Sequence, residues 1–267
     1  GGGGGASGGG NSDGLPLRAA RGRGDLERPC FDLDVPSDGY AWWYVDGISD
    51  DGARAISIIG FIGSVFSPWY RWSGRKNPAN HCCLNVVTYG RGGRWTMTDR
   101  GQSALGLSRD RLQIGPSAMV WADDHLRIEI NEMSTPHAQR ITGEVIIRPA
   151  ALTGVEMALT PDGGHIWRPF APKARIQVRL NRPGWTWTGH GYFDANFGTR
   201  ALEADFRYWT WGRFPLRDGA ACFHDAQRRD GSELAAAIGF AEDGTPRAIA
   251  MPPKARLSRP GWMVRRE

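Results

Sequence analysis

The sequence TWTGHGYFDAN, residues 186–196, indicates the fold class because polar and bulky residues alternate along it. In an extended strand, successive side chains point to opposite faces, and residues i and i+2 lie about 6.6 Å apart on one face. The first face would carry Thr188, His190, Tyr192, Asp194 and Asn196. The second would alternate bulk with bare backbone, as when another segment packs closely, through Trp185, Trp187, Gly189, Gly191 and Phe193. We predict a strand whose polar face lines a site. The alternative is a barrel strand with its polar side in water.

The chain from Tyr40 onward continues as short alternating segments separated by turn signals. The predicted strands are 55–62, 81–89, 94–99, 126–130, 141–147 and 176–180. The predicted turns are 50–52, 90–93, 161–164 and 243–244. No window of a dozen residues keeps a helical period, and 232–238 is at most a weak exception. We therefore predict an all-β protein built from barrels or sandwiches.

Composition limits the classes of function. The chain has 267 residues, 40% of them hydrophobic, which suits one large β domain or two smaller ones. Its net charge is +5, which fits attraction to anionic lipid. We expect no nucleic-acid partner, because no nucleic-acid-binding motif or long basic run is present. The four cysteines lack metal-ligand spacing, so we expect no metal site and a reduced, cytoplasmic setting. Cys82 and Cys83 would point to opposite faces of a strand, and we expect them to be small core residues and not a redox pair.

The least apolar segment and the longest apolar run of the chain give two further expectations. Residues 1–29 are rich in Gly with scattered Arg and have no apolar periodicity, which predicts a disordered tail. The longest apolar run, 55–69, is interrupted by Gly, Ser and Pro and is shorter than the roughly 20 residues that cross a bilayer. We expect no membrane span there. Because the sequence begins with glycines, we interpret it as a fragment of a longer protein.

Tryptophan is unusually abundant, with 12 residues against six Tyr. It can form a core, a membrane-interface belt or the lining of a site for an apolar or cationic ligand. In YAWWYVDG, residues 40–47, alternation places Trp42, Tyr44 and Asp46 on one face. We predict that this face contacts a ligand.

A second aromatic group combines rings with basic residues in FSPWYRW, residues 66–72. This combination is typical of an interfacial membrane anchor. The predicted membrane-contact residues are Trp69, Tyr70, Arg71 and Trp72, followed by Arg75 and Lys76. The alternative is a solvent loop with a packed aromatic side chain.

Seven longer motifs extend over the chain from about residue 36 to its end. They are YAWWYVDGISDDG (40–52), IIGFIGSVFSPWYRW (58–72), HCCLNVVTYG (81–90), TDRG (98–101), LTGVEMAL (152–159), HIW (165–167) and GHGYFDANFG (189–198). Together they resemble the carotenoid 1,2-hydratases, also called hydroxyneurosporene synthases. The resemblance implies a cofactor-independent hydro-lyase that adds water to the terminal double bond of an acyclic carotenoid such as neurosporene or lycopene. It also implies tandem lipocalin-like β-barrels, with most of the site in a first barrel at 30–200 and a second, C-terminally truncated barrel at 201–267.

The resemblance further implies a catalytic set, which here is His165, Trp167, Tyr192 and Asp194. Hydration of a trisubstituted alkene starts with protonation of the less substituted carbon and leaves a tertiary cation that water captures. We expect Asp194 to be the acid, because burial in an aromatic cavity can keep a carboxyl group protonated. The π face of Trp167 would stabilise the cation. Either His165 or Tyr192 would orient and deprotonate the water.

Several assignments remain open at this point. The predicted substrate-binding residues are Trp42, Tyr44, Asp46, Trp187 and His190. Asp46 is a rival acid and His190 a rival base, whereas His81 and His224 are expected to be structural. Two other functions fit an aromatic cavity: a lipocalin-like carrier that releases its lipophilic ligand unchanged, and a polyene cyclase that adds no net water. For the hydratase, we expect peripheral association with a membrane surface from the cytoplasm.

Overall fold

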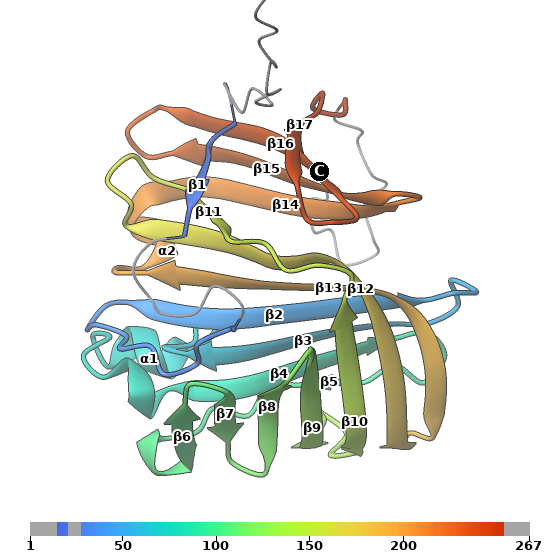
Figure 1. Cartoon of the computed structure of the whole chain (residues 1–267). Coiled ribbons are helices and arrows are strands. Elements are labelled where there is room, and N and C mark those ends of the chain that lie inside the picture. Colours follow the sequence, from blue (N-terminus) through green and yellow to red (C-terminus); the bar gives the residue numbers. More distant parts are fainter. Residues whose placement is uncertain (1–14, 21–27, 254–267) are drawn as a thin grey trace, which may run out of the picture.

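The computed structural model describes residues 15–20 and 28–253, which form two antiparallel β-sheets (Figure 1). The larger sheet contains β1 (Leu17–Ala19), β2 (Tyr40–Ser49), β3 (Ala55–Ile62), β4 (Cys82–Tyr89), β5 (Trp95–Thr96), β6 (Leu105–Ser108), β7 (Arg111–Ile114), β8 (Ser117–Ala122), β9 (His125–Met133), β10 (Arg140–Pro149), β11 (Val155–Ala158), β12 (His165–Arg182) and β13 (Trp185–Gly198). The smaller sheet contains β14 (Phe206–Leu216), β15 (Gly219–Arg228), β16 (Glu233–Ala241) and β17 (Pro246–Ala248). The short helices are α1 (Pro68–Trp72) and α2 (Leu202–Asp205), with 3₁₀ turns at Pro78–Asn80 and Gln102–Ala104. The predicted all-β class is confirmed.

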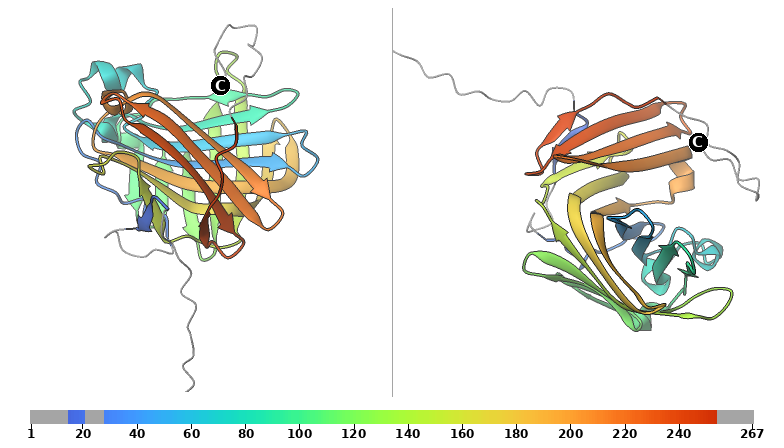
Figure 2. Two further views of the ribbon diagram at one scale, coloured as in Figure 1. Left: turned by 90° about the horizontal axis from the view of Figure 1, so that it is seen from above. Right: turned by 90° about the vertical axis from the view of Figure 1, so that its right-hand side faces the viewer.

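The larger sheet curls into a half-barrel, and β12 and β13 run through its bend (Figure 2). Its strand order is β5-β4-β3-β2-β13-β12-β10-β9-β8-β7-β6, with β11 on β12 and β1 on β11. The β12–β13 pairing shifts register at two points between Arg168 and Ala174. Pro169 and Pro172 lie in this stretch, and proline cannot donate to a ladder. The long strands therefore change direction here, so that one half joins the half-barrel and the other lies under the smaller sheet.

The concave side of the half-barrel holds the first core. Alternate residues of β9, namely Leu126, Ile128 and Ile130, are buried there, as period-two patterning requires. On β13, a Cβ atom at Gly191 would lie 3.2 Å from the Cβ of Ile176. The bare backbone predicted on this face thus permits close packing.

A second core lies between the half-barrel and the smaller sheet. It joins Trp167 and Tyr192 to Cys222, Ile238 and Phe240. Consequently β13 is buried on both faces from residue 191 to residue 196. Polar residues in this part of the strand face a protein interior and not water.

Several sequence predictions can be compared with these elements. β3 has the predicted bounds, and the predicted turn at 50–52 joins it to β2. Residues 17–19 of the predicted tail instead form β1, because they gain a ladder with β11; residues 1–14 and 21–27 lie outside the described residues. Residues 232–238 fall largely in β16, so the weak helical signal there was wrong. The larger sheet ends at residue 198 and the smaller begins at residue 206; the division into tandem barrels stays a prediction, and 254–267 lie outside the described part.

Cys82 and Cys83 are core residues, as predicted, and all four cysteines are free and buried. Cys82 packs in the concave core and Cys83 in a cluster with Tyr40, Trp42 and Phe61, which confirms that they point to opposite faces. In the described part of the chain, no helix combines the length and apolarity that a bilayer crossing requires.

Candidate active site

An aromatic cavity of about 360 Å³ lies between the two sheets. Its lining residues are Trp42, Tyr44, Ile59, Phe61, Val65, Phe66, Trp167, Asp194, Asn196, Leu202, Trp209 and Trp211. Among these described residues, only Asp194 and Asn196 have a side chain that is neither aromatic nor aliphatic. A single carboxyl group therefore faces an otherwise apolar space.

Strand pairing arranges the site in three successive rows, about 7 Å apart along the strands. Each row takes one residue from β2, β3 and β13, and one residue of β14 contacts the β2 member. The rows are Trp42, Phe61, Asn196 and Trp209; then Tyr44, Ile59, Asp194 and Trp211; then Asp46, Ser57, Tyr192 and Arg213. Charged groups other than Asp194 appear only in the third row. Polarity thus increases toward the β2–β3 turn.

Asp194 is 3% exposed and is hydrogen-bonded on both oxygens. Its Oδ2 accepts from Trp167 Nε1 at 2.8 Å and from the Tyr192 hydroxyl at 2.6 Å, and its Oδ1 accepts from Asn196 Nδ2 at 3.2 Å. Burial raises the pKa of Asp194 to about 7, even though the bonds from Tyr192 and Trp167 favour the ionised form. The carboxyl group can therefore carry a proton near neutral pH.

Oδ1 is the oxygen of Asp194 on which we expect this proton. Oδ2 already accepts two hydrogen bonds, which leaves it little capacity to donate. Oδ1 faces Asn196, whose own Oδ1 has no hydrogen-bond partner among the described groups. A flip of the Asn196 amide would turn its oxygen toward the carboxyl group, so Asn196 can bond either protonation state.

His165 is buried, but it does not line the aromatic cavity. Its Nδ1 accepts from the Tyr40 hydroxyl at 2.8 Å, and its Nε2 donates to Asp205 Oδ2 at 2.8 Å. Asp205 is also paired with Arg200. The Tyr40 ring can reach His165 because residue 198 is glycine, where a Cβ atom would lie 2.2 Å from that ring. Both nitrogens of His165 are thus engaged by protein groups.

His224 lies beside Trp167 of the predicted catalytic set, although the sequence indicated only a structural role. Its ring centroid lies 4.4 Å from that of Trp167, at an interplanar angle of 63°. Trp209 Nε1 donates to His224 Nδ1 at 3.2 Å, so the ring proton of the neutral form is on Nε2. Burial lowers the pKa of His224 to about 3. The ring therefore stays neutral behind Trp167. Its isolated position in the sequence gave no signal of this contact.

Asp46, the rival acid, does not line the cavity. It accepts a hydrogen bond from the Tyr44 hydroxyl at 2.8 Å and one from Arg213 Nε at 2.6 Å. Arg213 also stacks on the Tyr192 ring, with 5.6 Å between its Cζ and the ring centroid. This geometry makes Asp46 the acceptor of an ion pair and not a proton donor to the cavity.

Besides Asp46, two further predicted substrate-binding residues, Trp187 and His190, lie outside the cavity. Trp187 faces the other side of β13 and packs against the concave core. His190 lies on the polar face but is exposed, because the smaller sheet covers this strand only from Tyr192 onward. The predicted alternation was right, but the surroundings change along the strand.

The aromatic residues around α1 adjoin the mouth of the cavity. Trp69 and Trp72 are 59% and 71% exposed, and Phe66, which lines the cavity, is 60% exposed. Tyr70 is buried, and its hydroxyl donates to the carbonyl oxygen of Gly39 at 2.6 Å. Its predicted membrane contact is therefore wrong, because the helix turns this side chain inward.

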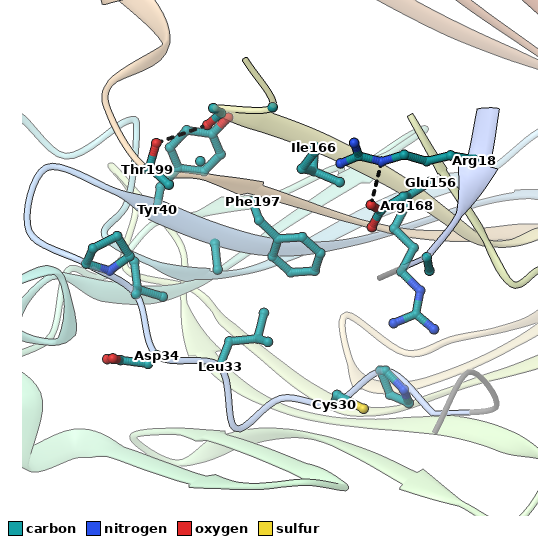
Figure 3. Close-up of a pocket in the computed structure, with 18 residues that line it drawn as sticks. Arg18, Cys30, Leu33, Asp34, Tyr40, Glu156, Ile166, Arg168, Phe197 and Thr199 are labelled. Carbon is teal, nitrogen blue, oxygen red and sulfur yellow. Dashed lines mark hydrogen bonds and ion pairs between the residues drawn. The ribbon is translucent and has the colours of Figure 1, made fainter. Parts of the chain in front are cut away.

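A second pocket, of about 240 Å³, shares no lining residue with the aromatic cavity (Figure 3). It contains an ion pair between Arg18 and Glu156, at 2.9 Å, and the buried Arg168. Asp194 and Trp167, two residues of the predicted catalytic set, line the aromatic cavity and not this pocket. Within the described ranges, no three His, Cys, Asp or Glu side chains are grouped to hold a metal ion.

Solved structures share the fold at low sequence identity. The putative AttH protein of Nitrosomonas europaea matches with a TM-score of 0.52 and 18% identity, over 80% of this chain and 71% of that chain. CghA matches with a TM-score of 0.51 and 9% identity, over 91% of this chain and 69% of that chain. These likenesses concern the fold alone.

Sequence comparison identifies the family. The family model for carotenoid hydratase CrtC matches residues 58–267. Identity to the acyclic carotenoid 1,2-hydratase of Cereibacter sphaeroides is 61% over 210 residues, which are 78% of this chain and 75% of that protein. The corresponding protein of Rhodobacter capsulatus is 57% identical over 212 residues, with 79% and 75% covered, and that of Thiocapsa roseopersicina is 40% identical over 260 residues, with 96% and 64% covered. The chain therefore belongs to the carotenoid hydratase CrtC family.

Proposed function

We propose that this protein adds water across the terminal C1–C2 double bond of an acyclic carotenoid such as lycopene or neurosporene. The observation that carries the proposal is the carboxyl group of Asp194, buried in an aromatic cavity with its pKa raised to about 7. Burying an ionisable group without a charged partner is costly. A carrier that only binds and releases a lipophilic ligand does not need a buried carboxyl group, whereas protonation of an alkene requires such an acid.

In the first step, Asp194 would transfer the proton on Oδ1 to C2 of the alkene. The π electrons form the new C–H bond and leave a tertiary cation at C1. The hydrogen bonds from Trp167 and Tyr192 to Oδ2 would stabilise the carboxylate that remains. These two residues thus hold the acid in place and support its conjugate base.

The cation would form among electron-rich rings. Trp167, Tyr44 and Trp211 all line the cavity, and a desolvated cation over such a ring gains about 2 kcal/mol. His224 stays neutral, so it adds no opposing charge behind Trp167. The cavity is also much smaller than a whole carotenoid, so we propose that it receives only one end of the chain.

In the second step, the oxygen of water would bond to C1 and release a proton to the Asp194 carboxylate, which restores the acid. We assign the orientation of this water to Tyr192, because its hydroxyl contacts Asp194 directly. His165 has no free nitrogen, and we propose that it positions β12 through its bonds to Tyr40 and Asp205.

We also propose that the substrate arrives from a membrane surface on the cytoplasmic side. A carotenoid is almost insoluble in water, and the exposed Trp69 and Trp72 adjoin the cavity mouth at Phe66. Arg71 and Lys76 are exposed beside them and can approach anionic headgroups. Arg75, also predicted for this contact, is paired with Glu203.

The test is incubation of the full chain with lycopene in detergent, followed by mass analysis of the carotenoids. A gain of one water per modified end is expected, and it should be lost in Asp194→Asn. Lycopene that is bound but returned unchanged would indicate a carrier. A changed product without added mass would indicate a cyclase.

A further inference from the structure

The aromatic cavity offers few partners to water, which is the second substrate of a hydration. Apart from Asp194 and Asn196, its lining is aromatic or aliphatic, and water needs two or more polar partners to be held. One further donor lies at its wall. Trp211 Nε1 is buried and has no hydrogen-bond partner among the described residues. Buried N–H groups are rarely unsatisfied, and ordered water is a common partner.

A polar pocket of about 270 Å³ lies behind this wall, at the third row of the site. It is lined by Asp46, Ser57 and Arg213, with Trp211 and apolar residues of the β2–β3 hairpin. Its volume exceeds that of several waters at about 30 Å³ each. Ile48 lines the pocket and is 43% exposed, so the pocket is in contact with solvent. The charged and hydroxyl groups in its wall offer water several hydrogen-bonding partners.

Tyr44 and Trp211 separate this pocket from the cavity. Their rings meet edge to face, with centroids 5.4 Å apart at an interplanar angle of 76°. Trp211 lines both spaces. The ring of Tyr44 lines the cavity while its hydroxyl bonds to Asp46 in the polar pocket. Asp194 pairs with Tyr44 across the strands, so the partition lies in the same row as the acid.

We propose that the polar pocket held by the Asp46–Arg213 ion pair is the water-binding site of the reaction, and that water reaches the cation past Tyr44 and Trp211. This inference rests on the proposed hydration. The two substrates then approach from opposite ends of the three rows, the polyene from the side of Phe66 and the water from the side of Asp46. Such separation keeps Asp194 desolvated until the polyene is bound, while the nucleophilic water is held in the adjacent pocket.

A deuterium experiment distinguishes water delivery from protonation. In D₂O, the exchanged carboxyl group transfers a deuteron to C2 of lycopene and forms the cation. If water then captures C1, the product gains one D₂O. If water does not arrive, a proton leaves C2 or an adjacent methyl group to the carboxylate, and a deuterated alkene is returned. Initial rates of both products, measured by mass, give the ratio of capture to return.

Two variants of the full chain alter the pocket in different ways. Ser57→Leu fills it with an apolar side chain, and Asp46→Asn combined with Arg213→Gln removes both charges without filling it. Thr186→Leu is the control for Ser57→Leu, because it also replaces a hydroxyl side chain by leucine, at an exposed strand position outside both spaces. Circular dichroism verifies folding. If Ser57→Leu does not fold, the double variant alone tests the proposed water route.

We expect the ratio of hydrated to deuterated, unhydrated carotenoid to fall about tenfold in both pocket variants, the effect of losing roughly one hydrogen bond to the nucleophile. The ratio in Thr186→Leu should equal that of the wild type. Equal ratios in all four proteins would overturn the water route while leaving the hydration intact. Absence of deuterium on carbon in the wild type would instead overturn the proposed function itself.

Discussion

Replacing Asp194 by Asn removes the proposed acid while keeping its shape. The introduced amide oxygen can accept from Trp167 and Tyr192 as Oδ2 does. Its NH₂ group then faces Asn196, whose unpartnered oxygen can accept after an amide flip. We therefore expect the variant to fold with its hydrogen bonds satisfied.

The raised pKa of Asp194 predicts a specific pH dependence of stability. Because the folded pKa lies above the unfolded one, the native state binds this proton more tightly, and stability falls as pH rises from about 4 to about 7. With an unfolded value of about 3.9 and a folded value of about 7, this group alone lowers the free energy of unfolding by about 3 kcal/mol between pH 5 and pH 8. The Asn variant lacks that contribution.

Urea unfolding of both proteins at pH 5 and pH 8 measures this difference. Groups such as His224, whose pKa is lowered by burial, titrate alike in both proteins and cancel. The free energy of unfolding of the wild type should fall by about 3 kcal/mol more than that of the variant over this interval. Parallel pH dependences would show that Asp194 titrates as an ordinary surface carboxyl, and the acid assignment would fail. Hydration should fall 10² to 10⁴-fold in the folded variant, and the wild-type rate should decline as pH rises through about 7.

Three other changes test the surroundings of the acid. Hydration rates should fall in the order wild type, Trp167→Phe, Trp167→Leu, because Phe keeps a weaker π face and Leu keeps none; equal rates for Phe and Leu would reduce the ring to packing. His224→Asn, which keeps an acceptor near the Nδ1 position, should retain more activity than His224→Leu, measured as initial rate on lycopene. Co-sedimentation with anionic liposomes should be partly released by salt and weakened by Trp69→Ser with Trp72→Ser, since the screening length falls from about 10 Å at 0.1 M to about 3 Å at 1 M; Tyr70→Phe, at a buried position, is the control.

The sequence predicted the strands better than their surroundings. Alternation along 186–196 correctly assigned which residues of β13 share a face. It could not show that His190 faces water while Asp194, four residues on, faces the aromatic cavity between the sheets. That difference depends on where the smaller sheet lies, which is set by contacts distant in sequence. β1 was missed for a related reason, because a three-residue edge strand has no periodicity and forms only by pairing with β11.

The residues of the candidate site could be predicted only where they lie within motifs. Tyr192 and Asp194 are two residues apart on one strand, and Trp167 reaches them from the neighbouring strand. Trp209 and His224 join the site from a different sheet. No local spacing relates them to Asp194, and an isolated histidine is more often structural. Such residues can be assigned to the site only from the structure, which shows the contact between the two sheets.

The smaller sheet therefore forms part of the surroundings of the proposed acid, Asp194. The hydrogen bonds that Asp194 receives from its own sheet favour the carboxylate, and on their own they would lower its pKa. Burial reverses this effect, and Trp209 and Trp211 of β14 line the cavity that Asp194 faces. Residues 30–200, which were expected to carry most of the site, include Asp194 and its hydrogen-bond partners. They do not include the residues of the smaller sheet that help to bury it. We therefore expect the pKa of Asp194 to depend on the contact between the two sheets.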